Sequence, residues 1–241
     1  MLDEAASAIR AALGTLDDWG LAGTKPGQYH SDLAADAAAV EVLLGHGYGV
    51  LSEETGRHHP ERAVTVVVDP LDGSTNASRG IPWYAISLCA VDAEGALAAL
   101  VVNLPDDLAF RAERGAGATA DDRVLAPSAK TALNESLVAL SGYPRQYLGW
   151  YQFRALGAAA LDLCAVASGV IDAYLDCSWN AHGPWDYLGG MLVCQEAGAF
   201  VADAQGRDLV TLEYTDRRTP VAAGNAALLD EAVEARRTLE H

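Results

Sequence analysis

The sequence contains neither a long apolar run nor an excess of positive charge. No stretch approaches the roughly eighteen apolar residues that a membrane-spanning helix needs, so no membrane partner is expected. With 16 Lys and Arg residues against 33 Asp and Glu residues, the formal net charge is −17. This charge argues against nucleic acid or an anionic membrane surface as a partner, because both repel an acidic protein.

Paired cysteines, repeats and low-complexity segments are also missing. The cysteines lie mostly in apolar contexts without Cys-x-x-Cys spacing, which favours buried free thiols over a zinc site or a disulfide framework. They are Cys89, Cys164, Cys177 and Cys194. With 241 residues, of which 51% are hydrophobic, the chain can bury a substantial core, and we expect one domain over residues 1–241.

The apolar spacing predicts the order of the main elements. The acidic N-terminal segment has the pattern of an amphipathic helix and not of a signal peptide, so we expect a cytoplasmic protein. Residues 239–241 resemble the remnant of a purification tag and are given no role. The predicted elements are helices at 2–19, 32–45, 157–168 and 185–197, strands at 49–52, 63–69, 137–141 and 170–176, a meander at 83–113, and a final strand and helix.

The most informative segment is residues 66–76, which read Val-Val-Val-Asp-Pro-Leu-Asp-Gly-Ser-Thr-Asn. Its β-branched start predicts a buried strand that ends at Asp69, because Pro70 cannot continue a hydrogen-bonded ladder. Asp72 follows, and Gly-Ser-Thr then favours the start of a helix with free backbone N–H groups. Two acids beside such a turn suit a metal-dependent phosphate site. Taken alone, the same acids are also common turn formers.

Acids at two other places would complete such a site. Glu53 and Glu54 follow the apolar residues 49–51, although adjacent glutamates are also typical of a solvated turn. Asp186 lies in the first turn of the helix predicted at 185–197, where a carboxylate also favours the helix dipole. Each segment therefore has a purely structural alternative when it is taken by itself.

Taken together, the three segments resemble the signatures of the inositol monophosphatase family, within the lithium-sensitive, magnesium-dependent sugar and inositol phosphatases. The resemblance covers roughly residues 25–223. It implies an α+β fold, a layered α-β-α-β-α sandwich, with sub-halves at about 1–130 and 131–238 and the metal cleft between them. It also implies a homodimer, because relatives are commonly dimeric.

The resemblance further implies two or three Mg²⁺ ions and the residues that hold them. The implied metal ligands are Glu53, Asp69, the Leu71 backbone carbonyl, Asp72 and Asp186. Asp72 and Asp186 would also contact the substrate. The backbone amides of Gly73 and Ser74 match positions that bind the phosphate, and Glu54 matches a residue beside the metals.

Asp36 and Lys25 are further implied site residues. Asp36 shares the apolar face of the helix predicted to begin at Asp32, where an uncompensated carboxylate is costly to bury. The alternative is a helix whose face is shifted by one residue. The resemblance places Asp36 at the third-metal position, paired with Ser74, where these two residues and Glu53 would act on the attacking water. Lys25 matches a mobile loop lysine near the metals, and an ordinary surface lysine is the alternative.

The residues expected to face the substrate depart from the family pattern. In the family a glutamate after the Asp-Ala-Tyr segment contacts a sugar hydroxyl, and counting forward puts Asp176 at that place. Counting backward from Asp186 puts Trp179 there instead. We favour the forward count, because the rim at 176–185 then carries its extra residues in a loop. Arg154 would meet either a second phosphate or a surface acid.

The function implied is that of a Mg²⁺-dependent phosphomonoesterase acting through metal-activated water. Its substrate would be a small polyol or sugar phosphate, with myo-inositol monophosphate first. Histidinol phosphate and fructose 1,6-bisphosphate are the alternative substrates. A silent phosphometabolite-binding or regulatory protein is the non-enzymatic alternative, and the acids at every implied ligand position speak against it.

Overall fold

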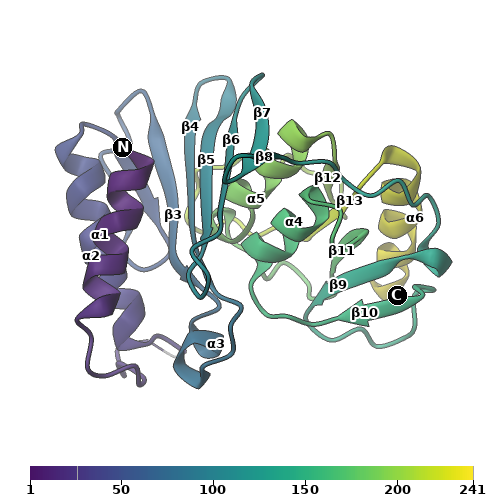
Figure 1. Ribbon diagram of the computed structural model, residues 1–241, viewed down its shortest axis with the longest axis horizontal. Helices are drawn as coiled ribbons and strands as arrows, with labels where there is room; N and C mark the ends of the chain where they lie inside the picture. Colours follow the sequence, from purple (N-terminus) through teal and green to yellow (C-terminus); the bar gives the residue numbers. More distant parts are fainter. Residues whose placement is uncertain (26, 241) are drawn as a thin grey trace.

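The protein is built from five alternating layers, seen edge-on in Figure 1, a computed structural model that describes residues 1–25 and 27–240. Helices α1 (Leu2–Gly14) and α2 (His30–Gly45) form the first layer, against a large sheet. Helices α4 (Ala159–Ala167) and α5 (Pro184–Ala197) lie between that sheet and a small sheet, and α6 (Ala226–Arg237) covers the far side. The predicted α-β-α-β-α sandwich is confirmed.

The large sheet has the strand order β2-β1-β3-β4-β5-β6-β7-β8. Strands β1 and β3 are parallel, and every other neighbouring pair in this sheet is antiparallel. The strands are β1 (Gly49–Ser52), β2 (Gly56–His58), β3 (Thr65–Asp72), β4 (Ala85–Asp92), β5 (Gly95–Asn103), β6 (Ala109–Glu113), β7 (Gly117–Ala120) and β8 (Arg123–Val124). The short helix α3 (Ser74–Arg79) follows β3 directly.

The small sheet has the strand order β10-β9-β11-β13-β12. Its strands are β9 (Leu137–Ser141), β10 (Gln152–Arg154), β11 (Ala173–Asp176), β12 (Phe200–Asp203) and β13 (Pro220–Ala223). Two 3₁₀ turns, η1 (Leu133–Glu135) and η2 (Thr238–Glu240), complete the described elements. The division into sub-halves stays a prediction. Leu239 and Glu240 of the tag prediction belong to η2, and residue 241 lies outside the described residues.

Alternation along β3 explains why helices cover both faces of the large sheet. Val66 and Val68 pack in the cluster that contains α1 and α2, and Val67 packs in the cluster that contains α4 and α5. Successive strand side chains point to opposite faces, so a strand that is buried at every position, as β3 is, has cover on both sides. Helix α1 ends at Gly14, before the predicted end at residue 19. Helix α2 begins at His30, before the predicted start at residue 32.

All four cysteines are free thiols, and three of them are buried. No helix within residues 1–25 and 27–240 is long and apolar enough to cross a membrane.

Helices α4 and α5 approach so closely that only glycine fits at one contact. A Cβ on Gly190 would lie 2.6 Å from Leu163 Cβ and 2.9 Å from the Ala160 carbonyl oxygen. Both neighbours belong to buried α4, which cannot withdraw without opening the core. This contact fixes how closely α5 packs against α4.

We therefore expect Gly190→Ala to lower the free energy of unfolding by about 1–3 kcal/mol, the usual cost of overpacking. Gly14→Ala is the matched control, because a Cβ there meets nothing within 4 Å. Urea unfolding measures both. Equal stabilities for the two variants would show that α4 and α5 do not pack as described.

Candidate metal centre

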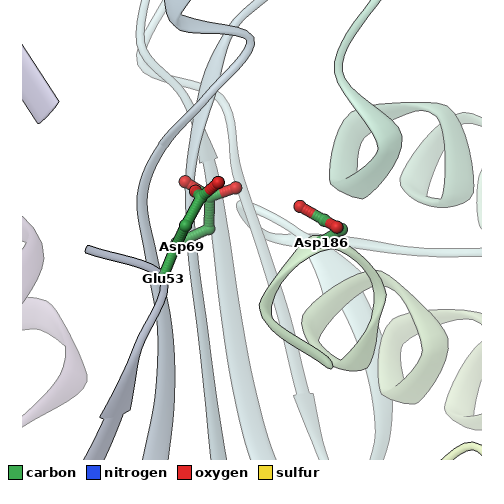
Figure 2. A group of neighbouring side chains, drawn as sticks. All are labelled: Glu53, Asp69 and Asp186. Atoms are coloured by element: carbon green, nitrogen blue, oxygen red, sulfur yellow. The ribbon is translucent and has the colours of Figure 1, made fainter. Parts of the chain in front are cut away.

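Three carboxylates from separate parts of the chain converge at one end of the large sheet. Glu53 directly follows β1, Asp69 lies near the end of β3, and Asp186 lies in the first turn of α5. One carboxylate oxygen of each lies within 4.8 Å of the other two. Figure 2 shows Glu53 and Asp69 side by side, with Asp186 facing them from the helix; β1, which Glu53 follows, pairs with β3. Oxygen ligands at this spacing suit a hard divalent cation.

The end of β3 has an irregularity that places two acids at the centre. Asp69 pairs with Ser87 of β4 and Asp72 pairs with Ala85, so the register shifts between the two acids. Pro70 lies in this interval and has no N–H to donate. A bulge of this kind re-aims side chains and is common beside active sites. The motif read from the sequence therefore becomes a local break in an otherwise regular strand.

Asp69 and Asp72 are both buried and are held by backbone N–H groups. Asp69 Oδ1 accepts a hydrogen bond from Leu71 N at 2.9 Å. Asp72 Oδ2 accepts one from Ala160 N at the start of α4, at 2.7 Å. Asp72 lies outside the group of three converging oxygens but close enough that the charge of Asp186 acts on it.

Asp186 is oriented by a histidine whose role the sequence analysis missed. Asp186 Oδ2 accepts a hydrogen bond from Gly183 N at 2.7 Å and lies 3.2 Å from His182 Nδ1. On its other side, His182 Nε2 lies 3.1 Å from both the Ser141 and Tyr174 hydroxyls. Partners of this kind fix the orientation of a metal-ligating carboxylate. His182 lies four residues before Asp186, outside the helix, and no sequence motif marks this pair.

Burial and like charge make this group of acids unfavourable without a cation. Burial, followed by the charges of neighbouring acids, raises the pKa of Glu53 and of Asp69 well above the usual range. Burial and then the charge of Asp186 raise the pKa of Asp72 to about 7. Bound divalent ions reverse this situation, because their charge favours the ionised carboxylates.

A cavity of about 250 Å³ opens beside the acids. Among the residues predicted for the site, it is lined by Lys25, Glu53, Glu54 and Ser74. The other lining residues are Gly27, Gln28, Asp32, Trp185, Tyr214 and Arg217. Lys25 Nζ donates a hydrogen bond to the Glu54 carbonyl at 2.8 Å, so the loop lysine lies beside the acids.

The predicted pairing of Asp36 with Ser74 is wrong. Asp36 is buried and accepts a hydrogen bond from the Ser52 hydroxyl. It is Asp32 that lines the cavity, and the nearby Ser74 side chain acts on the pKa of Asp32. Helix α2 begins at His30, so it contains both acids. Because they are four residues apart, Asp32 and Asp36 lie on the same buried face, one turn from each other.

Asp32 has the properties of a reactive carboxylate. Its Oδ2 accepts a hydrogen bond from Tyr29 N at 2.8 Å, and its Oδ1 is buried without a partner among the described residues. Burial raises the pKa of Asp32 to about 6. A buried oxygen with an unused acceptor at the edge of a cavity suits a bound water or ion.

Asp176 and Arg154, which were predicted to face the substrate, do not line the cavity beside the acids. Asp176 is fully buried at the end of β11, where Oδ1 accepts a hydrogen bond from Ser178 N and lies 3.8 Å from His182 Nε2. Arg154 lies on the exposed edge strand β10 and donates a hydrogen bond to the Phe153 carbonyl. Trp179, the alternative to Asp176, is exposed and lines a different cavity.

Gly73 and Ser74 stand where the phosphate-binding turn was predicted. Gly73 is the N-cap of α3 in the left-handed conformation, with φ of 85°. A Cβ there would lie 3.1 Å from the carbonyl oxygens of Trp83 and Gly157, so glycine is needed on both counts. The first N–H groups of α3 have no partner within the helix, as at any helix start.

Comparisons with known proteins give the class. Residues 32–241 match the model of the inositol monophosphatase family. An inositol-1-monophosphatase of Mesorhizobium japonicum is 35% identical over 75% of this chain and 74% of its own length. A fructose-1,6-bisphosphatase/inositol-1-monophosphatase of Thermococcus kodakarensis is 34% identical over 85% of this chain and 80% of its own.

A solved structure agrees with these relatives. The extragenic suppressor protein suhB of Bartonella henselae superposes with a TM-score of 0.82 at 28% identity, covering 98% of this chain and 96% of that chain. The chain therefore belongs to the inositol monophosphatase family, which is a family of phosphatases. That family is magnesium-dependent in general, and the converging acids offer a place for the metal.

The raised pKa values predict how the metal-free protein responds to pH. An acid whose pKa is higher in the folded state contributes stability below its unfolded pKa and loses it as the pH rises through the folded value. For Asp72 that window runs from 3.8 to about 7, and Glu53 and Asp69 act in the same direction. In EDTA, the free energy of unfolding should therefore fall between pH 5 and pH 8.

Urea unfolding in EDTA and in magnesium checks this expectation. Magnesium should raise stability more at pH 8 than at pH 5, because it binds the ionised acids. Asp72→Asn should flatten the fall in EDTA. Asp122→Asn, at an exposed position, should leave it unchanged. Stability that rises with pH in EDTA would contradict the described electrostatics.

Proposed function

We propose that the protein is a Mg²⁺-dependent phosphomonoesterase that releases inorganic phosphate from a small polyol or sugar phosphate. The observation that carries the proposal is the convergence of Glu53, Asp69 and Asp186 within 4.8 Å of one another beside a cavity. A buried group of acids without compensating cations is costly, and a cavity beside it gives a phosphate ester access.

The donor set fits magnesium. Glu53, Asp69, Asp72 and Asp186 offer only oxygen, and together with the Leu71 carbonyl they would hold two or three ions. When bound, magnesium neutralises the phosphate and acts as a Lewis acid. The number of ions and the part played by Leu71 belong to this proposal.

The residues around the ions position the reacting groups. The N–H groups of Gly73 and Ser74 would bind the phosphate oxygens at the start of α3. The Ser74 hydroxyl would orient the attacking water, and Asp32 would accept its proton, since Oδ1 is unused and the pKa is raised to about 6. In this proposal Asp32 replaces Asp36 in the catalytic group, beside Glu53.

myo-Inositol monophosphate is the first substrate to test, because a relative named inositol-1-monophosphatase covers three quarters of the chain. Histidinol phosphate and fructose 1,6-bisphosphate are the alternatives, and a relative that carries both activities in its name supports including the bisphosphate. Inhibition by lithium, a homodimer and a cytoplasmic location are further predictions from the family. The convergence of Glu53, Asp69 and Asp186 favours an enzyme over a silent binding protein, because a binding protein has no need of acids placed to hold a metal ion.

Asp186→Asn tests the enzymatic proposal. Loss of a charged ligand should lower kcat by at least about 100-fold, as for other losses of electrostatic stabilisation. The fold should remain, since asparagine preserves the acceptor of the Gly183 hydrogen bond. Phosphate release from the substrate panel, with and without magnesium, measures the effect.

The matched control for Asp186→Asn is Asp230→Asn, at an exposed position on α6. This control should keep wild-type turnover. Near-normal turnover in Asp186→Asn would remove Asp186 from the mechanism. Absence of magnesium-dependent phosphate release by the wild-type chain on every substrate would favour the binding protein.

A comparison of Asp32→Asn with Asp36→Asn tests the assignment of the proton acceptor. The first substitution should lower kcat by about 100-fold or more, the usual contribution of a general base. The second should leave kcat within about 3-fold, because Asp36 faces Ser52 and not the cavity. Steady-state kinetics at saturating magnesium gives both values. The reverse order would restore Asp36 to the site.

A further inference from the structure

Besides Lys25, a second cationic side chain, Arg217, lines this cavity. The guanidinium carbon of Arg217 lies 5.0 Å from the centre of the Trp185 ring. Both residues line the cavity, and Trp185 directly precedes Asp186. Arg217 comes from the segment between β12 and β13, more than thirty residues after Asp186 in the chain.

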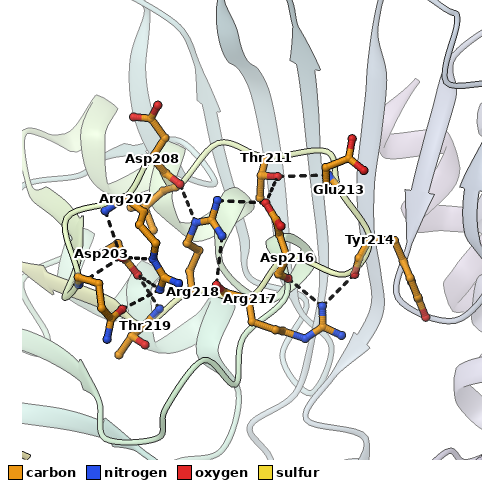
Figure 3. Close-up of polar contacts among 12 residues, drawn as sticks. Asp203, Arg207, Asp208, Thr211, Glu213, Tyr214, Asp216, Arg217, Arg218 and Thr219 are labelled. Carbon is orange, nitrogen blue, oxygen red and sulfur yellow. Dashed lines mark hydrogen bonds and ion pairs between the residues drawn. The ribbon is translucent and has the colours of Figure 1, made fainter. Parts of the chain in front are cut away.

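The segment around Arg217 holds this side chain in place (Figure 3). Arg217 Nη1 donates hydrogen bonds to the backbone carbonyls of Tyr214 at 2.9 Å and Asp216 at 2.8 Å. The Tyr214 hydroxyl donates a hydrogen bond to the Glu53 carbonyl at 2.8 Å. The Tyr214 and Trp185 rings lie 5.2 Å apart. The guanidinium is thus fixed from one side by backbone and aromatic contacts.

Arg217 differs from the other arginines of its segment. Arg207 forms an ion pair with Asp203 at 2.7 Å, and Arg218 forms one with Asp216 at 3.1 Å. Among the residues that the structure describes, no carboxylate lies within ion-pair distance of Arg217. Its Nε and Nη2 groups make no hydrogen bond to another described residue. Donors remain available on a side chain that lines a cavity.

The position is unusual for a cation that has only a structural role. It lies at the N-terminal end of α5, where the helix dipole favours negative charge. The face of Trp185 stabilises the cation there. A fixed guanidinium presents a planar fork that matches phosphate and carboxylate oxygens. Arg217 and the helix start therefore favour the same kind of ligand, an anion.

We propose that Arg217 binds a second anionic group of the substrate, a phosphate or carboxylate carried away from the reacting phosphate. This inference rests on the proposed phosphatase function, in which the reacting phosphate is bound by the acids and α3. Lys25 is already bonded to the Glu54 carbonyl beside those acids. Arg217 thus takes the role that the sequence analysis offered to Arg154, which lies outside the cavity.

Arg217→Gln tests the proposal on matched substrates. One pair is fructose 1,6-bisphosphate and fructose 1-phosphate, and the other is 3-phosphoglycerate and glycerol 1-phosphate. Loss of a charge-assisted contact should raise KM about 10- to 100-fold for the member with the second anion. For its partner, KM and kcat should stay within about 3-fold, because the lost contact is remote from the reacting phosphate.

The control variant is Arg57→Gln. Arg57 forms an ion pair with Glu213 at 2.9 Å, so it contacts the same segment and carries the same charge, but it does not line the cavity. It should leave the ratio between the members of each pair unchanged. Normal turnover of the members with a single anionic group by Arg217→Gln shows that the variant is folded.

The two pairs separate the possible anions. A selective loss on the bisphosphate pair supports a second phosphate, a selective loss on the glycerate pair supports a carboxylate, and losses on both support either anion. Equal losses on both members of every pair, or no loss at all, overturn the proposal. Equal losses would instead mean that Arg217 contacts the reacting phosphate or is needed to maintain the shape of the cavity.

A binding measurement separates failure of this inference from failure of the proposed function. Calorimetric titration of fructose 1,6-bisphosphate and fructose 1-phosphate in calcium requires no turnover. If the wild-type chain binds both but releases no phosphate in magnesium, the enzymatic proposal fails. Tighter binding of the bisphosphate that disappears in Arg217→Gln would still support the anion site, and its persistence would overturn it.

Discussion

The mutual repulsion of closely spaced carboxylates, one buried and two half-buried, is the constraint on which this structure depends. Glu53, Asp69 and Asp186 are brought within 4.8 Å of one another, in surroundings that raise the pKa of the first two well above the usual range. Such an arrangement persists only where the rest of the fold imposes it, or where cations compensate it. The layers, the bulge in β3 and the packing of α5 together impose it, and magnesium is the cation that the donor set favours.

Much of this could be predicted from short segments. Three local patterns were visible: the strand that leads to Asp69, the turn after Asp72, and the helix start that contains Asp186. Their joint occurrence resembled one family, and this resemblance predicted both the layered fold and the converging acids. The error at Asp36 arose because Asp32 and Asp36 share one helix face, and periodicity cannot tell which of them reaches the cavity.

What sequence reasoning missed depends on tertiary packing. Asp176 lies on a strand that is buried along its whole length, so its side chain is buried and does not line the cavity. His182 acquires its role because Tyr174 and Ser141 meet it from neighbouring strands. Arg217 reaches Trp185 from a segment without regular structure. Contacts of this kind have no period and no motif, so no local pattern indicates them.

The place of α5 separates two tasks that many enzymes combine. Its body is buried between the sheets, and at Gly190 it packs so closely against α4 that no side chain fits. The acid in its first turn is therefore held by a tightly packed helix. Arg217 lies instead on the segment between β12 and β13, which is joined to the backbone after β1 by the hydrogen bond from the Tyr214 hydroxyl to the Glu53 carbonyl. If Arg217 binds a second anion as we propose, the residues that hold the metals and the residue that selects the substrate lie on different parts of the scaffold. Substitutions at Arg217 would then alter which compounds are accepted without changing the acids that hold the metals.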